Sequence, residues 1–225
     1  MKLGIIGPCE PEIAPFIQKM DVTATEHQAK LTFHSGTYAG TNLVAVFCGV
    51  CKVNAAIAAQ LLISQHQVTH MLVVGVAGAI DENLAIADTI VSSETAYHDV
   101  ADGILTQYHP WMKTVYFTSD KTLTQAIMAA NADDPSVSLG RIVTGEAFIE
   151  QEGRDTIIKN HRPLCVDMET AAIAHVCHAN DIPFAAIRSV SDTPHESGTA
   201  AFERYMQQAA NKSIAVLCRY LDANK

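Results

Sequence analysis

The sequence predicts a single α/β domain, residues 1–225, built as a three-layer sandwich with a central mixed sheet. Apolar segments of strand length alternate with segments of helical periodicity along the whole chain. Hydrophobic residues make up 48% of the 225 residues, which is enough to bury a full core. We find no repeat, low-complexity stretch or linker. This alternation is typical of one sheet covered by helices on both faces.

Eight segments have the pattern of strands. The segments 3–6 and 71–76 are continuous apolar runs, as in strands buried on both faces. The segments 30–38 and 42–47 flank a turn at Ala39–Gly40–Thr41, which predicts a hairpin. The remaining expected strands are 89–92, 141–144, 165–167 and 184–190.

The helix patterns lie between these strands. A helix over 10–19 contains Pro15, which we expect to bend or shorten it. A helix over 169–180 ends at Asn180, with Pro183 beyond it, and both residues are typical of a helix end. The other expected helices are 53–64, 122–131, 155–159 and the amphipathic 200–221.

The charge balance excludes two classes of partner. Lys and Arg total 15 against 24 for Asp and Glu, a net charge of −9. Nucleic acids and anionic membranes attract basic surfaces, so we expect neither as a partner. We expect no transmembrane helix, and the apolar run after Met1 is too short for the core of a signal peptide. The sequence thus predicts a cytoplasmic protein whose six cysteines are thiols.

Functional groups in such folds collect just beyond the carboxyl ends of strands. Three carboxylates have this position: Glu12, Glu169 and Asp192. Each also has an ordinary structural interpretation: Glu169 could complement a helix dipole, Asp192 could cap a turn, and Glu12 could be a solvated helix residue. Together they favour hydrolysis of a glycosidic bond, which needs a set of carboxyl groups.

The motifs at these positions point to one family. The segments are 2–7 with Glu10 and Glu12, 76–78, 97–99, 144–149, 166–169 continuing to 174–178, and 188–192 with Phe202. They cover nearly the whole chain in order. With them the sequence resembles the 5′-methylthioadenosine/S-adenosylhomocysteine nucleosidases of the nucleoside phosphorylase superfamily.

The resemblance implies a role for each carboxylate. Glu12 would activate the attacking water, Asp192 would protonate N7 of the leaving adenine, and Glu169 would bind the ribose 2′- and 3′-hydroxyls. Adenine leaves poorly as an anion, so an acid at N7 removes the developing charge, and a carboxylate stabilises the oxocarbenium-like sugar. Glu12 must be ionised while Asp192 is protonated, so we expect their environments to separate their pKa values.

The resemblance also implies a substrate-binding set. Phe148 would stack on the base, the backbone of Ile149 would bind its edge, Arg188 would help hold the water, and Ser191 would orient Asp192. The other members are Val50, Ala77, Gly78, Val166, Met168 and Phe202, with Val50, Met168 and Phe202 forming an apolar pocket for the 5′ group. The family pattern implies a small-molecule nucleoside substrate, no cofactor, no metal and a homodimer.

The sequence departs from the family at several positions. Val76 lacks the hydroxyl that would bind an oxyanion, and Cys48–Gly49–Val50–Cys51 replaces a glycine-rich turn. The stretch 100–117, which in the family reaches the partner subunit's pocket, differs in length and composition. The preference among 5′ substituents, methylthio, homocysteinyl or another, therefore stays open.

Three alternative functions remain at this point. A phosphorylase would replace water by phosphate, but Glu10 and Glu12 would repel that anion. Cys48 and Cys51 have the spacing of a dithiol redox pair. A nucleoside-binding protein without catalysis is the third. We expect His175, Cys177 and His178 to be structural rather than metal ligands, and His98 and Asp99 to be structural or pocket-lining.

Overall fold

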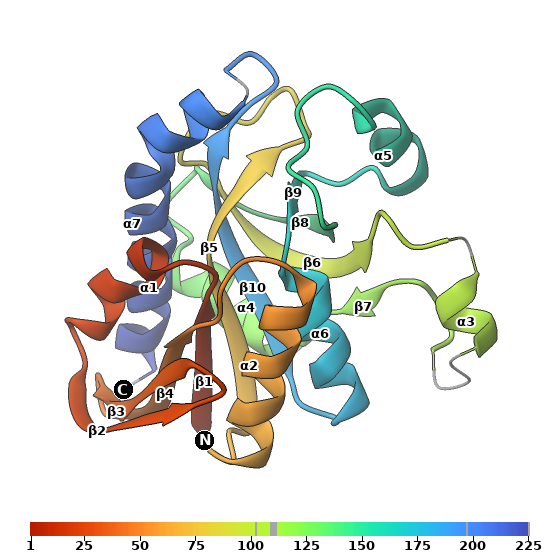
Figure 1. Cartoon of the computed structure of the whole chain (residues 1–225). Coiled ribbons are helices and arrows are strands. Elements are labelled where there is room, and N and C mark those ends of the chain that lie inside the picture. The colour runs from red at the N-terminus through yellow and green to blue at the C-terminus, as the bar shows by residue number, and fades with distance from the viewer. Residues whose placement is uncertain (102, 109–111, 197, 225) are drawn as a thin grey trace.

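The computed structural model describes residues 1–101, 103–108, 112–196 and 198–224. Within these ranges ten strands form one sheet and seven helices pack around it (Figure 1). The strands are β1 (Lys2–Gly7), β2 (Asp21–Gln28), β3 (Leu31–Tyr38), β4 (Thr41–Phe47), β5 (His70–Ala79), β6 (Thr89–Tyr97), β7 (Phe117–Thr118), β8 (Val137–Thr144), β9 (Cys165–Asp167) and β10 (Phe184–Asp192). The helices are α1 (Glu10–Ile17), α2 (Lys52–Ser64), α3 (Ile104–Tyr108), α4 (Lys121–Ala130), α5 (Arg154–His161), α6 (Thr170–Ala179) and α7 (Thr199–Ala223).

Strand β5 is the centre of the sheet. It pairs in parallel with β1 and β10 and antiparallel with β9. From β1 the sheet continues through β4, β3 and β2, while β10, β6, β8 and β9 lead back to β5. The second half of the sheet therefore closes into a ring, and the carboxyl ends of the parallel strands β1, β5 and β10 lie together at one end of the molecule.

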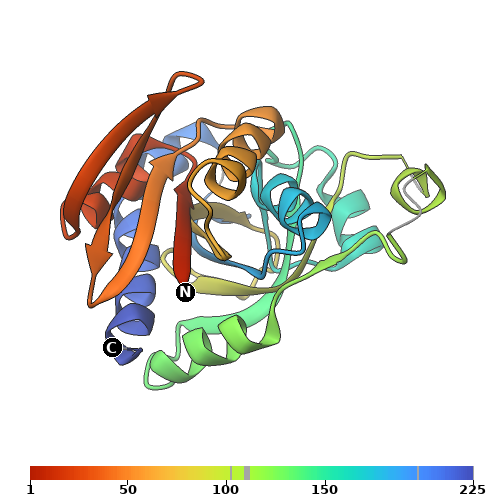
Figure 2. The ribbon, with the colours of Figure 1, turned by 90° about the horizontal axis from the view of Figure 1, so that it is seen from below.

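Helices cover the sheet on both faces, and each face has its own core. Helices α1, α4 and α7 pack on one face around Leu3, Phe16 and Leu217, and α2 and α6 pack on the other around Leu62 and Ile173. Figure 2 shows α7 and α4 on the opposite side of the sheet from α2 and α6. The predicted arrangement of a mixed sheet between helices is confirmed.

Most expected elements are present, with shifted ends. Helix α1 ends at Ile17, two residues before the expected end, and contains Pro15 as predicted. Strand β6 continues to Tyr97 and β10 to Asp192, so polar residues expected beyond those strands lie within them. Strand β2 was not predicted, because all eight of its residues are exposed and show no apolar alternation.

The stretch 100–117 contains helix α3 and the first residue of β7, neither of which the sequence pattern indicated. Figure 1 shows α3 on an arm that extends away from the sheet. Residues 102 and 109–111 of this stretch lie outside the described part of the chain.

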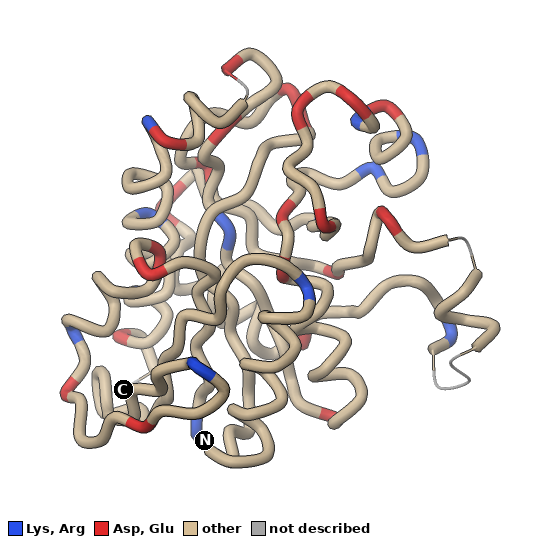
Figure 3. The backbone as a smooth tube through the Cα atoms, viewed as in Figure 1, with Lys and Arg blue, Asp and Glu red and all other residues tan. Residues whose placement is uncertain are grey.

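Charge is distributed unevenly over the chain. Figure 3 shows many of the acidic positions around the end of the sheet where β5 and β10 finish. None of the described helices is long and apolar enough to cross a membrane.

Candidate active site

A cavity of about 360 Å³ lies at the carboxyl ends of β1, β5 and β10. Its lining comes from seven separate segments of the chain. The lining residues are Pro8, Cys9, Glu12, Val50, Val76, Ala77, Gly78, Ala147, Phe148, Ile149, Val166, Asp167, Met168, Glu169, Ser191, Asp192, Thr199 and Phe202.

Every site residue predicted from the sequence lines this cavity except Arg188. Arg188 is on β10, is 0% exposed, and lies behind the cavity wall among the carboxylates. The lining residues that the sequence did not indicate as site residues are Pro8, Cys9, Val76, Ala147, Asp167 and Thr199. The fold therefore brings the predicted set to one place, while the role of each side chain stays a prediction.

Arg188 is the cation of a buried ion cluster. Its Nη2 lies 2.8 Å from Asp167 Oδ2 and 3.2 Å from Glu169 Oε2, and its Nη1 lies 3.8 Å from Glu12 Oε2. Its Nε donates to Thr170 Oγ1 at 3.1 Å. One guanidinium thus faces three carboxyl groups, which holds their side chains in place and leaves the cluster negative when all three are ionised.

Glu12 is held in the wall of the cavity from two sides. Its Oε2 accepts a hydrogen bond from the backbone N–H of Val76 at 2.7 Å and faces Arg188. Burial raises the pKa of Glu12, and the Arg188 charge and the Val76 N–H oppose that rise. The carboxyl group is therefore fixed in one orientation toward the end of β5.

Gly75 makes this approach possible. Its backbone has φ +151, and a Cβ built there would overlap Glu12 Oε2 and lie 2.7 Å from Arg188 Nη1. A side chain at this position would push the carboxylate and the guanidinium apart. The absence of a Cβ is thus a structural requirement of the ion cluster, not only of the strand.

Glu169 joins the cavity to the start of α2. It is the cap residue before α6, and its Oε1 accepts from the backbone N–H of Cys51 at 2.9 Å. Burial raises the pKa of Glu169 to about 7, opposed by Arg188 and reinforced by Asp167. Cys51 itself has φ +80, an uncommon conformation for a residue with a side chain, and it directs this N–H at the carboxylate.

Asp167 is the residue of the cluster that sequence reasoning missed. Its Oδ1 accepts from Thr144 Oγ1 at 2.5 Å and from the backbone N–H of Thr170 at 3.2 Å, and its Oδ2 accepts from Thr170 Oγ1 and Arg188. It thereby fixes the first turn of α6, which carries Glu169. An Asp three residues before a Thr at a helix start is a capping signal that could have indicated this position.

Asp192 lies apart from the Arg188 cluster. Its Oδ1 accepts from Ser191 Oγ at 2.9 Å, as an orienting role for Ser191 requires. Burial raises the pKa of Asp192, and the Ser191 hydrogen bond and the charge of Arg154 oppose the rise. Arg154, which the sequence did not single out, donates to the carbonyls of Ala79 and Ile80 at the end of β5.

The expected separation of the two pKa values does not appear as opposite shifts. Burial raises the pKa of both Glu12 and Asp192. The groups that oppose the rise differ: Glu12 faces the buried guanidinium of Arg188, whereas Asp192 accepts from the Ser191 hydroxyl and is influenced by the charge of Arg154.

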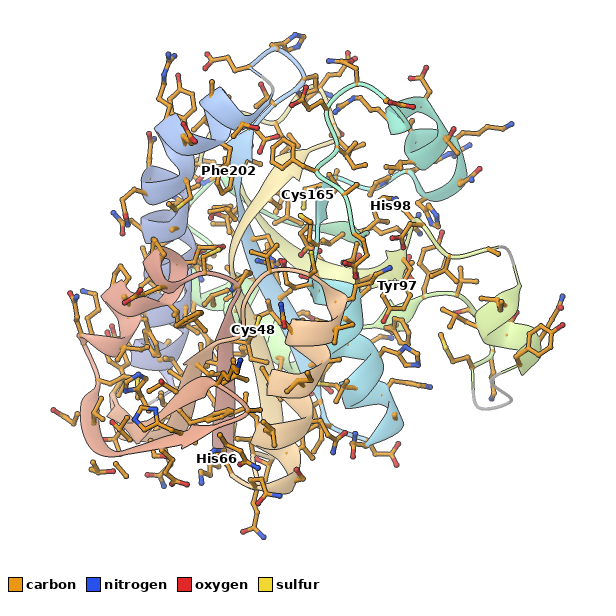
Figure 4. The ribbon with its side chains drawn as sticks, in the orientation of Figure 1. Cys48, His66, Tyr97, His98, Cys165 and Phe202 are labelled. Carbon is orange, nitrogen blue, oxygen red and sulfur yellow. The ribbon has the colours of Figure 1, made fainter. Side chains whose placement is uncertain are left out.

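The remaining wall is apolar. Phe148 and Phe202 meet edge to face with ring centroids 6.1 Å apart, and Val50 lies half-exposed at the mouth of the cavity. Figure 4 shows Phe202 on α7, across the strand ends from Tyr97, the last residue of β6, and from His98, which follows it. Such a surface suits a flat base or an aliphatic group rather than a charged ligand.

The cysteines do not have the surroundings of a redox pair. Cys48 is buried, its Sγ donates to the carbonyl of Gly49, and burial raises the pKa of the thiol. Burial also raises the pKa of Cys51, and it raises that of Cys9 to about 12. Reactive thiols need a lowered pKa, so this geometry disfavours the dithiol interpretation.

The histidines of α6 belong to an aromatic cluster. His175 stacks on Phe117 with ring centroids 4.9 Å apart, and Tyr97 Oη lies 3.3 Å from His175 Nδ1. The ring of His178 meets the edge of Phe117. Among the described residues no group of three or more His, Cys, Asp or Glu side chains is placed to hold a metal ion.

Comparison with known proteins identifies the family. The sequence-family model of the phosphorylase superfamily matches residues 2–222 of this chain. A 5′-methylthioadenosine/S-adenosylhomocysteine nucleosidase from Maridesulfovibrio salexigens is 36% identical over 230 residues, spanning 98% of this chain and 99% of that protein. The chain belongs to this nucleosidase family. The resemblance drawn from the sequence motifs is confirmed.

Solved structures of the nucleosidase family have the same fold. The enzyme from S. pneumoniae, bound to the transition-state inhibitor MT-ImmA, has a TM-score of 0.91 and 31% identity, covering 100% of both chains. The enzyme from Colwellia psychrerythraea 34H, in complex with adenine, has a TM-score of 0.88 and 33% identity, covering 98% of this chain and 94% of that one. The prediction of an adenosine-type nucleosidase is confirmed at the level of the family.

Proposed function

We propose that this protein hydrolyses the N-glycosidic bond of 5′-methylthioadenosine, S-adenosylhomocysteine or both, releasing adenine and the 5-thio-substituted ribose. The observation that supports this most directly is the convergence of three buried carboxyl groups, Glu12, Glu169 and Asp192, on one cavity with apolar walls. The family relatives carry the names of these two substrates. Ionisable groups with raised pKa values in a cavity are typical of acid–base catalysis.

In the proposed reaction the bond from C1′ to N9 breaks and a bond from water oxygen to C1′ forms. Asp192 gives its proton to N7, so that adenine leaves neutral, and Glu12 takes a proton from the attacking water. Glu169 accepts hydrogen bonds from the ribose 2′- and 3′-hydroxyls and stabilises the positive sugar ring. Phe148 stacks on the base, and Val50, Met168 and Phe202 contact the 5′ substituent.

The surroundings of Val76 favour water over phosphate as the nucleophile. Its backbone N–H, which could bind a phosphate oxygen, donates to Glu12. Among the described residues that line the cavity there is no Lys or Arg, and Arg188 already faces three carboxyl groups. A phosphate in this place would meet Glu12 rather than a cation, so phosphorolysis is disfavoured.

We expect adenine release to be independent of phosphate. The purified protein should release adenine from 5′-methylthioadenosine and S-adenosylhomocysteine at the same rate in phosphate-free buffer and in buffer with added phosphate. The sugar product should be the free thioribose rather than its 1-phosphate, because Glu12 repels the anion. Chromatography of adenine and of the sugar product measures both expectations.

A panel of adenosines with different 5′ substituents tests the substrate class in the same assay. The apolar contacts at Val50 and Phe202 predict faster release from thioether substrates than from adenosine with its 5′-hydroxyl. A rate that rises with phosphate, together with accumulation of a ribose 1-phosphate, would contradict the proposal and support a phosphorylase.

We further propose that the protein is a homodimer that pairs through α2. This helix exposes Val53 (69%) and Ile57 (42%), one turn apart, next to Val50 at the mouth of the cavity. An exposed apolar face beside a binding site is typical of a protein interface. The arm at α3, with exposed Ile104 and Tyr108, adds further apolar surface.

We expect the wild-type protein to sediment with twice the mass of the chain at micromolar concentration. The double substitution Val53→Asp and Ile57→Asp should shift it to the monomer, because charge at the centre of an interface opposes association. Ile158→Asp, which changes a similarly exposed apolar residue on α5, serves as the control and should leave the mass unchanged. A monomeric wild-type protein would contradict the dimer.

A cytoplasmic location completes the proposal. All six cysteines are free thiols, which is typical of a reducing compartment.

A further inference from the structure

The coil between β8 and α5 holds the base-binding side chain of the proposed site. It contains Phe148 and Ile149, which line the cavity, but these residues have no regular secondary structure. Phe148 is 42% exposed, so packing alone fixes it only on one side. Ile149 packs on the buried cluster of Ile80, Val143, Ile157 and Val166, and the start of the coil is held at Gly145 and Glu146.

Strand β6 holds the start of the coil. The backbone N–H of Glu146 donates to Asp99 Oδ2 at 2.9 Å, just beyond the end of β6. The ring of His98 packs directly on Gly145, where any Cβ would overlap its Nε2. The backbone N–H of His98 also donates to the carbonyl of Thr144 at 3.0 Å.

Helix α2 holds the side chain of Glu146. The backbone N–H of Lys52, the first residue of α2, donates to Glu146 Oε1 at 3.0 Å. The preceding N–H, that of Cys51, donates to Glu169 Oε1. Two successive amides at one helix start thus bind the proposed ribose carboxylate and the carboxylate of the base-binding coil, which fixes their relative position.

The side chain of Lys52 connects these two supports. Its Nζ lies 2.9 Å from both carboxylate oxygens of Asp99 and 3.9 Å from Glu146 Oε1. It also lies over the ring of Tyr97, 5.2 Å from the centroid. Burial would raise the pKa of Asp99, but the hydrogen bonds from Lys52 and Glu146 outweigh it, so that pKa is lowered. Asp99 therefore stays an acceptor for the Glu146 N–H.

We propose that Lys52, Asp99 and Glu146 form a latch that positions Phe148 and Ile149 against the purine, with Lys52 and Asp99 acting as positioning residues. The proposal rests on the proposed function, since it assigns the purine to the Phe148 side of the cavity. None of the three is a catalytic residue: each acts through the coil. Loss of the latch should weaken binding of the base without removing the acid, the base or the ribose carboxylate.

The test is a set of substitutions at Lys52 and Asp99. Lys52→Met keeps the chain length of the side chain but removes the cation, and we expect it to raise the KM about tenfold while changing kcat by less than about threefold. The dissociation constant of free adenine, measured by calorimetry, should rise by a similar factor. Asp99→Asn, which keeps an acceptor oxygen, should have a smaller effect than Asp99→Ala.

Hydrogen exchange supplies a readout that does not depend on turnover. The amide of Glu146 should exchange faster in Lys52→Met and Asp99→Ala than in the wild-type protein, because its acceptor is loosened or removed. Lys212→Met is the matched control. It breaks a comparable Lys–Asp pair with Asp134, 2.7 Å long and similarly exposed, on the turn before β8, and it should change neither KM nor the exchange of Glu146.

The outcomes separate the two proposals. If the wild-type protein releases no adenine from any nucleoside but binds adenine, the proposed function fails, and the calorimetric comparison still tests the latch. If the wild-type protein is active and Lys52→Met lowers only the melting temperature, with KM, adenine affinity and Glu146 exchange unchanged, the latch is wrong and the ion pair has only a structural role.

Discussion

Asp192→Asn should reduce adenine release by about 10²- to 10⁴-fold, the contribution expected of one general acid. The amide has the shape of the carboxyl group and can still accept from Ser191, so the fold should be preserved. It has no proton to give to N7, and adenine must then leave as an anion. Steady-state kinetics with 5′-methylthioadenosine, together with thermal unfolding, measures both parts of this expectation.

A substrate whose leaving group needs no proton separates acid catalysis from a general loss of activity. With p-nitrophenyl riboside, Asp192→Asn should retain most of the wild-type rate, because nitrophenolate leaves readily as an anion. Asp133→Asn changes an exposed aspartate and should leave the rate with each of the two substrates unchanged. If Asp192→Asn kept more than about a tenth of the adenine-releasing activity, the acid role would be untenable.

Arg188→Gln should have the largest effect on stability. The wild-type guanidinium is fully buried against Asp167, Glu169 and Glu12. Burial alone would lower the pKa of Arg188, but these carboxylates raise it, so the cation is permanent. Removing one partner of a buried ion pair lowers the free energy of unfolding by about 3–5 kcal/mol, because the opposite charge is left buried and uncompensated. Urea unfolding at pH 8 should show a loss of this size.

The loss should shrink at lower pH. The folded pKa of Glu169 is raised to about 7 from an ordinary value of 4.5, so the folded state holds more protons than the unfolded state between these values. The contribution of Glu169 to the free energy of unfolding is therefore fully present below about pH 4.5 and is lost as the pH rises through about 7. Without Arg188, protonation is the remaining way to neutralise the cluster, so Arg188→Gln should be closer to wild type at pH 5.5 than at pH 8.

Arg219→Gln is the matched control for this comparison. Arg219 pairs with Asp134 at 2.8 Å, but it is 41% exposed, and surface pairs contribute about 0–1 kcal/mol. Its effect should be small and nearly independent of pH. If both variants lost the same free energy of unfolding at pH 5.5 and pH 8, Arg188 would not be the group that compensates the charge of the buried carboxylates.

The sequence was most informative where periodicity and burial coincide. The apolar runs of β1 and β5 and the hairpin of β3 and β4 were predicted because buried strands leave a direct pattern in the chain. Strand β2 was not, since its exposed residues are held by pairing with β3 alone. Helix α3, on its arm, also lacks an amphipathic pattern because none of its residues is buried.

Some residues of the candidate site could be predicted from the sequence and others could not. Glu12 and Asp192 could be predicted because β1 and β10 are parallel to β5, and the carboxyl ends of parallel strands meet at one edge. Glu169 follows β9, which is antiparallel to β5 and pairs with its last residues, Gly78 and Ala79. Asp167 and Arg154 could not be singled out. Their importance comes from what they face, Arg188 in one case and the end of β5 beside Asp192 in the other.

By itself, the sequence determined the fold class, the family and the set of side chains near the strand ends, because these depend on local pattern and on motifs in order along the chain. Only the tertiary structure decided how those side chains are charged and held. A single buried guanidinium shared by three carboxylates, a glycine without which it could not approach Glu12, and two amides of α2 that bind Glu146 and Glu169 all join residues far apart in sequence. Their pKa values and orientations depend on distance and burial, which the order of residues does not contain.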